Sequence, residues 1–301
     1  MMFTEFAAKI KSLGRELSPE LLGGTRDIVT PLVPDNFLDG CKVTRDIAYG
    51  SDERHRLDVF QAKGASGLKP VLLFVHGGGF IAGDKHSEGS PFYSNIGAWA
   101  ADNGFAGVCM TYRLAPASPW PAGIEDIRQA VEFIQARGAD HGLDANRVFL
   151  MGQSAGGAHS AGYLAHPEVY GNKPHGLKGA ILLSAVYDFV SMPTTPMEQA
   201  YLGEDESTYY RKSSLDGLLE ADIPLLVSVA EYDPAKFQAQ TLQFLSAWLG
   251  KHGSLPWEVT MLGHNHLSPA LFLGLAGDQL APVLKRFIEE YSRDRRLPPG
   301  R

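Results

Sequence analysis

The stretch RVFLMGQSAGGAHSAGYLAH, residues 147–166, changes character in its middle. Its first part is an apolar run typical of a buried strand, and its last part is rich in small residues and typical of a helix. Between them, GQSAG at residues 152–156 fits the pattern Gly-x-Ser-x-Gly. That pattern places a serine at a sharp strand-to-helix turn, where only small neighbours avoid a collision. Because five residues with three fixed occur often by chance, the motif alone leaves open whether Ser154 is a nucleophile or a small turn residue.

Short apolar runs on both sides of this stretch alternate with helical patterns. The longest helical pattern places Ile124, Ile127 and Val131 on one stripe. Near-continuous apolar strands are typical of a sheet covered on both faces, so a mostly parallel sheet is expected. The predicted strands are residues 71–76, 105–113, 147–152, 179–187, 224–233 and 257–264. The sequence therefore predicts an α/β fold with helices on both faces of a central sheet, preceded by an antiparallel hairpin of residues 41–50 and 55–62.

Two segments fall outside this alternation. Residues 3–17 show the apolar spacing of an amphipathic helix, and a connector rich in Pro and Gly follows to about Gly40. Residues 188–222 are too many for a simple connector, which indicates a small helical insertion above the strand ends. We expect the insertion to dock with the N-terminal helix. The prediction is one domain, 1–301, with a small helical cap formed by about 1–40 and about 188–222.

A run of glycines, HGGGF at residues 76–80, directly follows the predicted strand VLLFV. Consecutive glycines let the backbone approach a ligand and turn its N–H groups outward, and with the N–H of Ala155 such groups can form an oxyanion hole. A flexible hinge is the alternative. A phosphate-binding loop is disfavoured because neither Gly-Lys-Ser/Thr nor Gly-x-Gly-x-x-Gly spacing is present. We expect His76 to fix this loop by hydrogen bonding.

An activated serine needs a base, and the base needs an acid to orient it. In this fold class the acid and then the base follow later strands, each at the strand's carboxyl end. The strand PLLVSVAEYDP ends at Asp233, which is our prediction for the acid. Glu231, two residues earlier, and Asp188, after the preceding strand, are the alternatives.

Two histidines compete for the role of base after the last strand, His264 and His266. His266 lies further out on the loop, where it can reach the serine, whereas His264 is close to the strand and suits a structural role. A His-x-His pair can also bind a metal ion, but no third ligand clusters nearby in the sequence. We therefore predict no metal site and no cofactor.

Several aromatic residues are candidates for lining a substrate pocket. Phe80 follows the glycine run, Tyr187 ends a predicted strand, and Tyr201 lies in the insertion. Buried aromatic side chains are also common in plain cores, so the alternative for each residue is a packing role.

The composition limits the range of partners. The formal net charge of −7 and the lack of a Lys/Arg run argue against a nucleic-acid partner. No apolar run approaches the roughly 18 residues of a membrane span, and residues 1–18 lack the pattern of a signal peptide. Cys41 and Cys109 are far apart and form no paired motif. We expect a cytoplasmic protein acting on a small molecule. The sequence does not determine its oligomeric state, and a homodimer is one of the options.

The motifs taken together, HGGGF, GQSAGG, EYDP and a final His-Leu, resemble the hormone-sensitive-lipase-like group of α/β-hydrolase fold carboxylesterases. The resemblance runs from about Ala48 to Leu284. It implies Ser154 as nucleophile, Asp233 as orienting acid and His266 as base, because a glycine, here Gly263, stands three positions before the family's base. It also implies that the oxyanion donors are the N–H groups of Gly78, Gly79 and Ala155.

The resemblance implies a serine carboxylesterase that forms an acyl-enzyme and hydrolyses short- to medium-chain esters. Two positions depart from the family pattern: Gln153 replaces an acidic residue, and Leu267 follows the base. Both resemble a bacterial branch near the kynurenine formamidases, so the alternative function is an arylformamidase with the same triad. A receptor on the same scaffold is a rival from another class, but such proteins usually lack the base or the nucleophile.

Overall fold

The computed structural model describes residues 3–170 and 175–293, so residues 1–2 of the predicted cap lie outside the described residues. Eight described strands form one sheet in the order β1-β2-β4-β3-β5-β6-β7-β8. The strands are β1 Cys41–Ala48, β2 Arg56–Ala62, β3 Lys69–Val75, β4 Ala106–Met110, β5 Leu143–Gln153, β6 Gly179–Leu183, β7 Leu225–Tyr232 and β8 Trp257–Asn265. Every predicted strand is present.

The pairing of the strands confirms a mostly parallel sheet. The six strands β4, β3, β5, β6, β7 and β8 pair in parallel with one another. Strand β2 pairs antiparallel with both β1 and β4. The hairpin β1–β2 therefore extends one edge of a parallel sheet. Because the parallel strands point the same way, the segments that follow β3, β5, β7 and β8 all emerge at one edge of the sheet.

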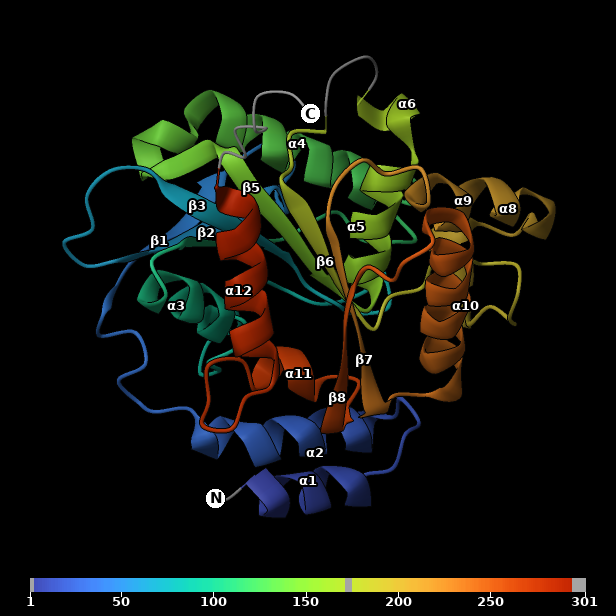
Figure 1. The fold of residues 1–301 in the computed structure, drawn as a ribbon, viewed down its shortest axis with the longest axis horizontal. Coiled ribbons are helices and arrows are strands. Elements are labelled where there is room, and N and C mark those ends of the chain that lie inside the picture. The colour runs from blue at the N-terminus through green and yellow to red at the C-terminus, as the bar shows by residue number, and fades with distance from the viewer. Residues whose placement is uncertain (1–2, 171–174, 294–301) are drawn as a thin grey trace.

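Helices cover both faces of the sheet (Figure 1). Along β3, Leu73 packs with Ile127 of α4 in one core, and Phe74 packs with Phe287 of α12 in the other. This alternation explains why the strand is apolar throughout, since each face meets a helix layer. The α-helices are α1 Phe3–Ser12, α2 Pro19–Val29, α3 Ser94–Asp102, α4 Ala122–Arg137, α5 Ala155–Ala165, α6 Pro167–Tyr170, α7 Pro196–Leu202, α8 Tyr209–Lys212, α9 Leu215–Leu218, α10 Ala235–His252, α11 Ser268–Leu271 and α12 Leu280–Ser292. Short 3₁₀ turns cover Thr30–Leu32, Gly138–His141 and Glu206–Thr208.

The N-terminal segment contains two helices, so the prediction of one helix followed by a connector is wrong. Ser18 caps α2 by accepting a hydrogen bond from the Leu21 N–H, and Pro19 occupies the first turn. Two adjacent glycines, which disfavour a helix, masked this signal in the sequence. A side chain on Gly24 would lie 2.7 Å from Leu13, so the glycine allows α2 to pack closely on the chain that follows α1.

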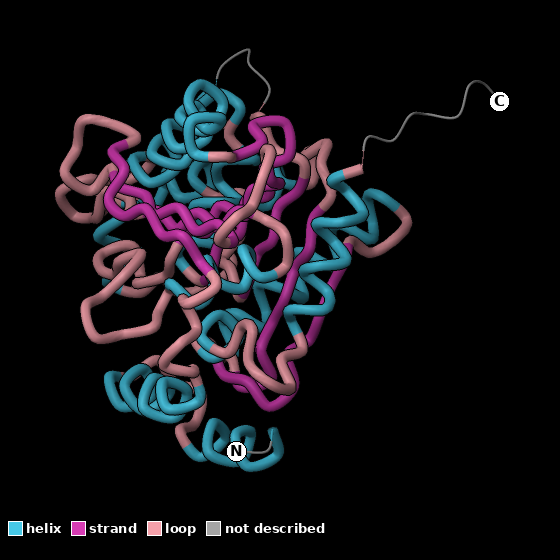
Figure 2. Tube along the Cα trace, turned by 90° about the vertical axis from the view of Figure 1, so that its left-hand side faces the viewer, coloured by secondary structure: helices cyan, strands magenta, loops and turns pink. Residues whose placement is uncertain are grey.

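The N-terminal helices and two helices of the insertion lie in different parts of the molecule. Figure 1 shows α1 and α2 at the bottom of the view and α8 and α9 at its upper right, and Figure 2 places α1 and α2 together at one end of the molecule. In the described ranges, the apolar cluster around Phe6 and the cluster around Tyr201 share no residue. The single domain with a two-part cap stays a prediction, as does the docking of the insertion with the N-terminal helix.

Candidate active site

Ser154 occupies the strained turn between β5 and α5. Its backbone angles, φ 56° and ψ −121°, lie outside the regions that a side chain ordinarily allows. Side chains on the two flanking glycines would meet close neighbours: Gly152 lies against Ser160 Oγ, and Gly156 lies against the backbone of Val75. The small residues of the motif therefore make this turn sterically feasible, and Ser154 remains partly accessible at its corner.

A continuous hydrogen-bond chain joins three side chains from three different strand ends. The Ser154 hydroxyl donates to Nε2 of His266 at 2.8 Å. Nδ1–H of His266 donates to Oδ1 of Asp233 at 2.6 Å. Since a carboxylate only accepts, the imidazole carries its proton on Nδ1 and presents an unprotonated Nε2 to the serine. This arrangement can remove a proton from the serine hydroxyl.

Asp233 is held rigidly at the end of β7. Its second oxygen, Oδ2, accepts from the Ser184 hydroxyl at 2.7 Å and from the Ala230 N–H at 2.6 Å. The Asp233 side chain is fully buried. Three hydrogen bonds thus satisfy a buried carboxylate, which would be costly to leave unpaired. Ser184 was not identified from the sequence, because only the fold brings the end of β6 beside the end of β7.

The two alternative acids make other contacts. Glu231 accepts a hydrogen bond from the Gly263 N–H at 2.8 Å, which ties β7 to β8. Asp188 accepts from the Val190 N–H at 2.9 Å and so closes a turn at the start of the insertion. In the described part of the chain neither carboxylate is bonded to His266, so both have roles in local structure.

His264 packs among the rings of Phe3, Phe6 and Phe272, and its Nδ1 is bonded to Ser268 Oγ at 2.9 Å. Burial lowers the pKa of His264 to about 4, so this histidine is neutral at physiological pH. The structure brings His266, and not His264, to the serine, and this is the arrangement that the sequence predicted.

The glycine loop lies directly beside the serine. Nδ1–H of His76 donates to the Gly77 carbonyl at 2.7 Å, which confirms that this histidine fixes the loop. A side chain on Gly77 would lie 3.2 Å from Ser154 Cβ. Gly78 and Gly79 have φ values of 133° and 60°, conformations that glycine adopts readily. The loop therefore depends on glycine for both space and backbone conformation.

The three predicted oxyanion donors are free to bind a ligand. Among the hydrogen bonds of residues 3–170 and 175–293, none is donated by the N–H groups of Gly78, Gly79 or Ala155. Ala155 is the first residue of α5, where N–H groups have no partner within the helix and the helix dipole favours negative charge. The geometry of this edge thus suits an oxygen that acquires negative charge.

Two of the three predicted pocket aromatics meet near the glycine loop. The rings of Phe80 and Tyr201 stack with centroids 4.5 Å apart, and both belong to the apolar cluster that contains Ala155. Tyr187 lies in a different cluster, fully buried and stacked on Phe244. The structure therefore groups Phe80 and Tyr201 beside the serine turn and places Tyr187 in the main core.

Further residues contact the base, the glycine loop or the two aromatic side chains beside it. The ring of Phe237 lies 4.2 Å from the imidazole of His266, measured between centroids. A side chain on Gly79 would lie 2.5 Å from Sδ of Met197 in α7, so the insertion covers the glycine loop. The buried ring of His159 packs against both Phe80 and Tyr201. These contacts assign the insertion, but not α1, to the space beside the glycine loop.

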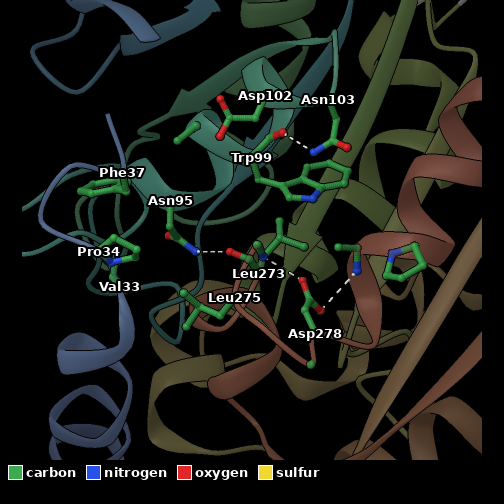
Figure 3. Close-up of a pocket in the computed structure, with 15 residues that line it drawn as sticks. Val33, Pro34, Phe37, Asn95, Trp99, Asp102, Asn103, Leu273, Leu275 and Asp278 are labelled. Carbon is green, nitrogen blue, oxygen red and sulfur yellow. Dashed lines mark hydrogen bonds between the residues drawn. The ribbon is translucent and has the colours of Figure 1, made fainter. Parts of the chain in front are cut away.

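A groove of about 460 Å³ lies apart from the triad, between α3 and the segments around residues 33–37 and 273–282 (Figure 3). The Asn95 amide donates to the Ala270 and Leu271 carbonyls at 2.9 and 3.2 Å. The Asp278 carboxylate accepts from the Leu280 N–H at 2.7 Å, which caps the start of α12. The polar side chains of this groove therefore hold the chain that follows His266.

The described residues contain neither a metal-binding cluster nor a helix that could span a membrane. Residues 3–170 and 175–293 hold no group of three or more His, Cys, Asp or Glu side chains placed to bind a metal ion. None of the helices in those ranges has the length and apolarity of a membrane-spanning helix. Cys41 and Cys109 are both buried free thiols.

The sequence profile of the BD-FAE family matches residues 57–218, just over half of the chain. The chain belongs to the BD-FAE family. The matched segment runs from the hairpin through the glycine loop and the serine turn into the insertion, and ends before Asp233 and His266. The family assignment therefore rests on the nucleophile side of the site.

Curated relatives of this BD-FAE chain are esterases by name. The chain is 38% identical over 120 residues to the isoprenylcysteine alpha-carbonyl methylesterase ICME of Arabidopsis thaliana. This match covers 40% of this chain and 27% of that protein. It is 40% identical over 93 residues to Esterase LipI of Mycobacterium tuberculosis, covering 31% of this chain and 28% of LipI. The matches span less than a third of the length of these relatives.

Solved structures share the fold of the BD-FAE chain over nearly its whole length. Esterase B from Lactobacillus rhamnosis, inhibited by a tributyrin phosphonate, matches with a TM-score of 0.74 and 18% identity, covering 97% of each chain. The Bacterial Heroin Esterase matches with a TM-score of 0.69 and 23% identity, covering 96% of this chain and 98% of that one. These structural matches confirm the α/β-hydrolase fold. The family match and the esterase relatives confirm the resemblance to the hormone-sensitive-lipase-like esterases.

Proposed function

We propose that this protein is a serine carboxylesterase with Ser154 as nucleophile, His266 as base and Asp233 as orienting acid. The observation that carries the proposal is the hydrogen-bond chain from the Ser154 hydroxyl through His266 to Asp233, with distances of 2.8 and 2.6 Å. Family membership and the esterase names of the relatives support the reaction class. A serine turn without this chain would support only a structural role for the motif.

In the first half of the reaction, Nε2 of His266 takes the proton of the Ser154 hydroxyl as Oγ attacks the ester carbonyl. The imidazolium that results is stabilised by the buried Asp233 carboxylate. The carbonyl oxygen becomes an oxyanion, which accepts hydrogen bonds from the free N–H groups of the glycine loop and Ala155. The tetrahedral intermediate then collapses, and His266 returns the proton to the departing alcohol.

In the second half, water replaces the alcohol. Its proton passes to Nε2 of His266 as its oxygen attacks the acyl carbonyl, and the same N–H groups stabilise the second oxyanion. Collapse releases the carboxylic acid and returns the proton to Ser154 Oγ. The enzyme is restored without a metal ion or an organic cofactor in either step.

We propose short- to medium-chain esters as substrates. Bulky side chains lie next to the groups that surround the serine: Met197 lies over Gly79, and Phe237 lies against His266. Phe80 and Tyr201 fill the cluster next to Ala155 and are proposed to contact the substrate. A short acyl group fits beside these side chains more readily than a long chain does.

The test is hydrolysis of a p-nitrophenyl ester series from acetate to long-chain acyl groups by wild type, Ser154→Ala and Ser66→Ala. Ser66 is an exposed serine between β2 and β3 and serves as the matched control. We expect the highest kcat/KM on the short esters, wild-type activity in the control, and none above background in Ser154→Ala. Turnover retained in a folded Ser154→Ala variant contradicts the proposal.

The same preparation tests the arylformamidase alternative. N-formylkynurenine is compared with the short esters as substrate, and an isoprenylcysteine methyl ester is added because of the names of the plant relatives. A kcat/KM for the formamide that exceeds the best ester value by tenfold or more would replace carboxylesterase by arylformamidase.

A further inference from the structure

The loop that carries His266 is held by the side chain of the residue before it. Asn265 is fully buried, and its Oδ1 accepts hydrogen bonds from the N–H groups of Leu267 and Ser268 at 3.2 and 3.1 Å. These bonds span His266 and close the backbone around it. The orientation of the imidazole therefore depends on where the Asn265 side chain is fixed.

The other end of the Asn265 side chain is fixed by the N-terminal segment. Nδ2–H of Asn265 donates to the hydroxyl oxygen of Thr25 in α2 at 2.8 Å, and this hydroxyl in turn donates to the Leu21 carbonyl at 2.6 Å. Thr25 is fully buried. A buried hydroxyl with one donor and one acceptor partner has a defined orientation, so it holds the amide in a single position.

Helix α2 is itself packed on the same loop. Figure 1 shows α2 directly below α11 and the end of β8. Val29 of α2 belongs to the apolar cluster that contains Leu267 and Leu271, on either side of the start of α11. Thr25 thus makes a polar contact from a helix that is also anchored by apolar packing.

We propose that Thr25 is a positioning residue for the catalytic base, and that it acts through Asn265. The hydroxyl of Thr25 fixes the Asn265 amide, the amide fixes the backbone on both sides of His266, and this backbone aims Nε2 at Ser154. This inference rests on the proposed function of the triad. It gives the N-terminal helices a part in catalysis that differs from covering the substrate.

The test compares Thr25→Val with Thr25→Ser. Valine has nearly the same shape as threonine but leaves the Asn265 N–H without an acceptor, whereas serine keeps the hydroxyl. Because small misplacements of a catalytic group are costly, we expect Thr25→Val to lower kcat by about tenfold with KM within about twofold of wild type. Thr25→Ser is expected to restore kcat to within about twofold.

A matched control separates positioning from loss of stability. Thr111 is a buried threonine whose hydroxyl donates to the Arg54 carbonyl at 2.5 Å, away from the His266 loop. Thr111→Val removes the hydroxyl of another buried threonine, so its Tm falls without a matching loss of kcat when activity is measured well below Tm. A kcat of Thr25→Val equal to wild type overturns the proposal, as does an equal loss in both variants.

Two further measurements show whether the effect passes through Asn265. In an Asn265→Ala background, Thr25→Val is expected to cause no additional loss of kcat, because the link is already broken. The proton NMR signal of the His266 Nδ1–H, which donates to Asp233, is expected to shift in Thr25→Val and to return in Thr25→Ser. Fully additive losses, or an unchanged signal, contradict the proposal. Absence of ester hydrolysis in wild type would instead contradict the proposed function.

Discussion

Gln153 and His266 lie 113 positions apart in the sequence, yet the side-chain amide of Gln153 donates to the His266 carbonyl at 2.9 Å. The residue before the nucleophile thus holds the backbone of the base. Replacing Gln153 by Glu exchanges this donor for an acceptor of the same size, which repels the carbonyl. We expect Gln153→Glu to keep its fold and to lose about tenfold in kcat. Steady-state kinetics on p-nitrophenyl acetate measure the loss, and full activity would show that this bond does not position His266.

The two candidate acids of β7 can be separated by matched amide substitutions. Asp233→Asn is expected to lower kcat by about 10⁴-fold, because an amide cannot hold the His266 tautomer as a carboxylate does. Glu231→Gln is expected to stay within about twofold of wild type, since a glutamine oxygen can still accept from the Gly263 N–H. The reverse pattern would transfer the role of acid to Glu231. Circular dichroism of both variants checks that the fold is unchanged.

Met197 is expected to limit acyl length, because its sulfur lies over the glycine loop. Met197→Ala opens space beside Gly79 without touching the triad. The ratio of kcat/KM for the octanoate to the acetate ester should rise by about tenfold, at the lower end of the roughly 10–200-fold that one methylene group can be worth in an apolar pocket. An unchanged ratio would place the acyl chain elsewhere.

The buried histidines predict acid sensitivity. Burial lowers the pKa of His159 to about 3 and that of His76 to about 4, against about 6.5 in an unfolded chain. Between pH 6.5 and 4 the unfolded chain binds protons that the native state does not, so the free energy of unfolding decreases as the pH falls. Each such histidine contributes about 1.4 kcal/mol per pH unit to this slope.

His159 allows this linkage to be tested, because neither ring nitrogen has a hydrogen-bond partner in the described residues. His159→Leu should leave the free energy of unfolding at pH 8 within about 1.5 kcal/mol of wild type and should make the decrease between pH 6.5 and 4 shallower. Urea unfolding at pH 8, 6 and 5 measures both quantities. A slope equal to that of wild type would show that His159 is not the group whose protonation unfolds the protein.

Local patterns predicted the sheet and the serine turn because both depend on neighbours in sequence. A parallel strand such as β3 is apolar over consecutive residues, and the sharp turn at Ser154 requires glycines within two positions. The order of the strand ends pointed to Asp233 and His266, which the structure joins to Ser154 in one hydrogen-bond chain. Each of these features is encoded within a few residues of the site that it forms.

Other features depend on contacts that no local pattern encodes. The double glycine of α2 suggested a connector, but in the folded chain Gly24 packs closely against the Leu13 side chain. Tyr187 follows a strand end as a pocket residue would, yet its ring turns into the core and stacks on Phe244. Ser184 and Thr25 are ordinary polar residues in the sequence, and only the folded chain brings them to Asp233 and Asn265.

The bond between Thr25 and Asn265 spans 240 positions, most of the chain. During synthesis α2 is made long before its polar partner, which exists only after β8 has been completed. Long-range contacts of this kind form late and slowly in folding. Ester hydrolysis regained during refolding therefore marks the moment at which the first and last parts of the chain meet, and it should lag behind the recovery of helical circular dichroism.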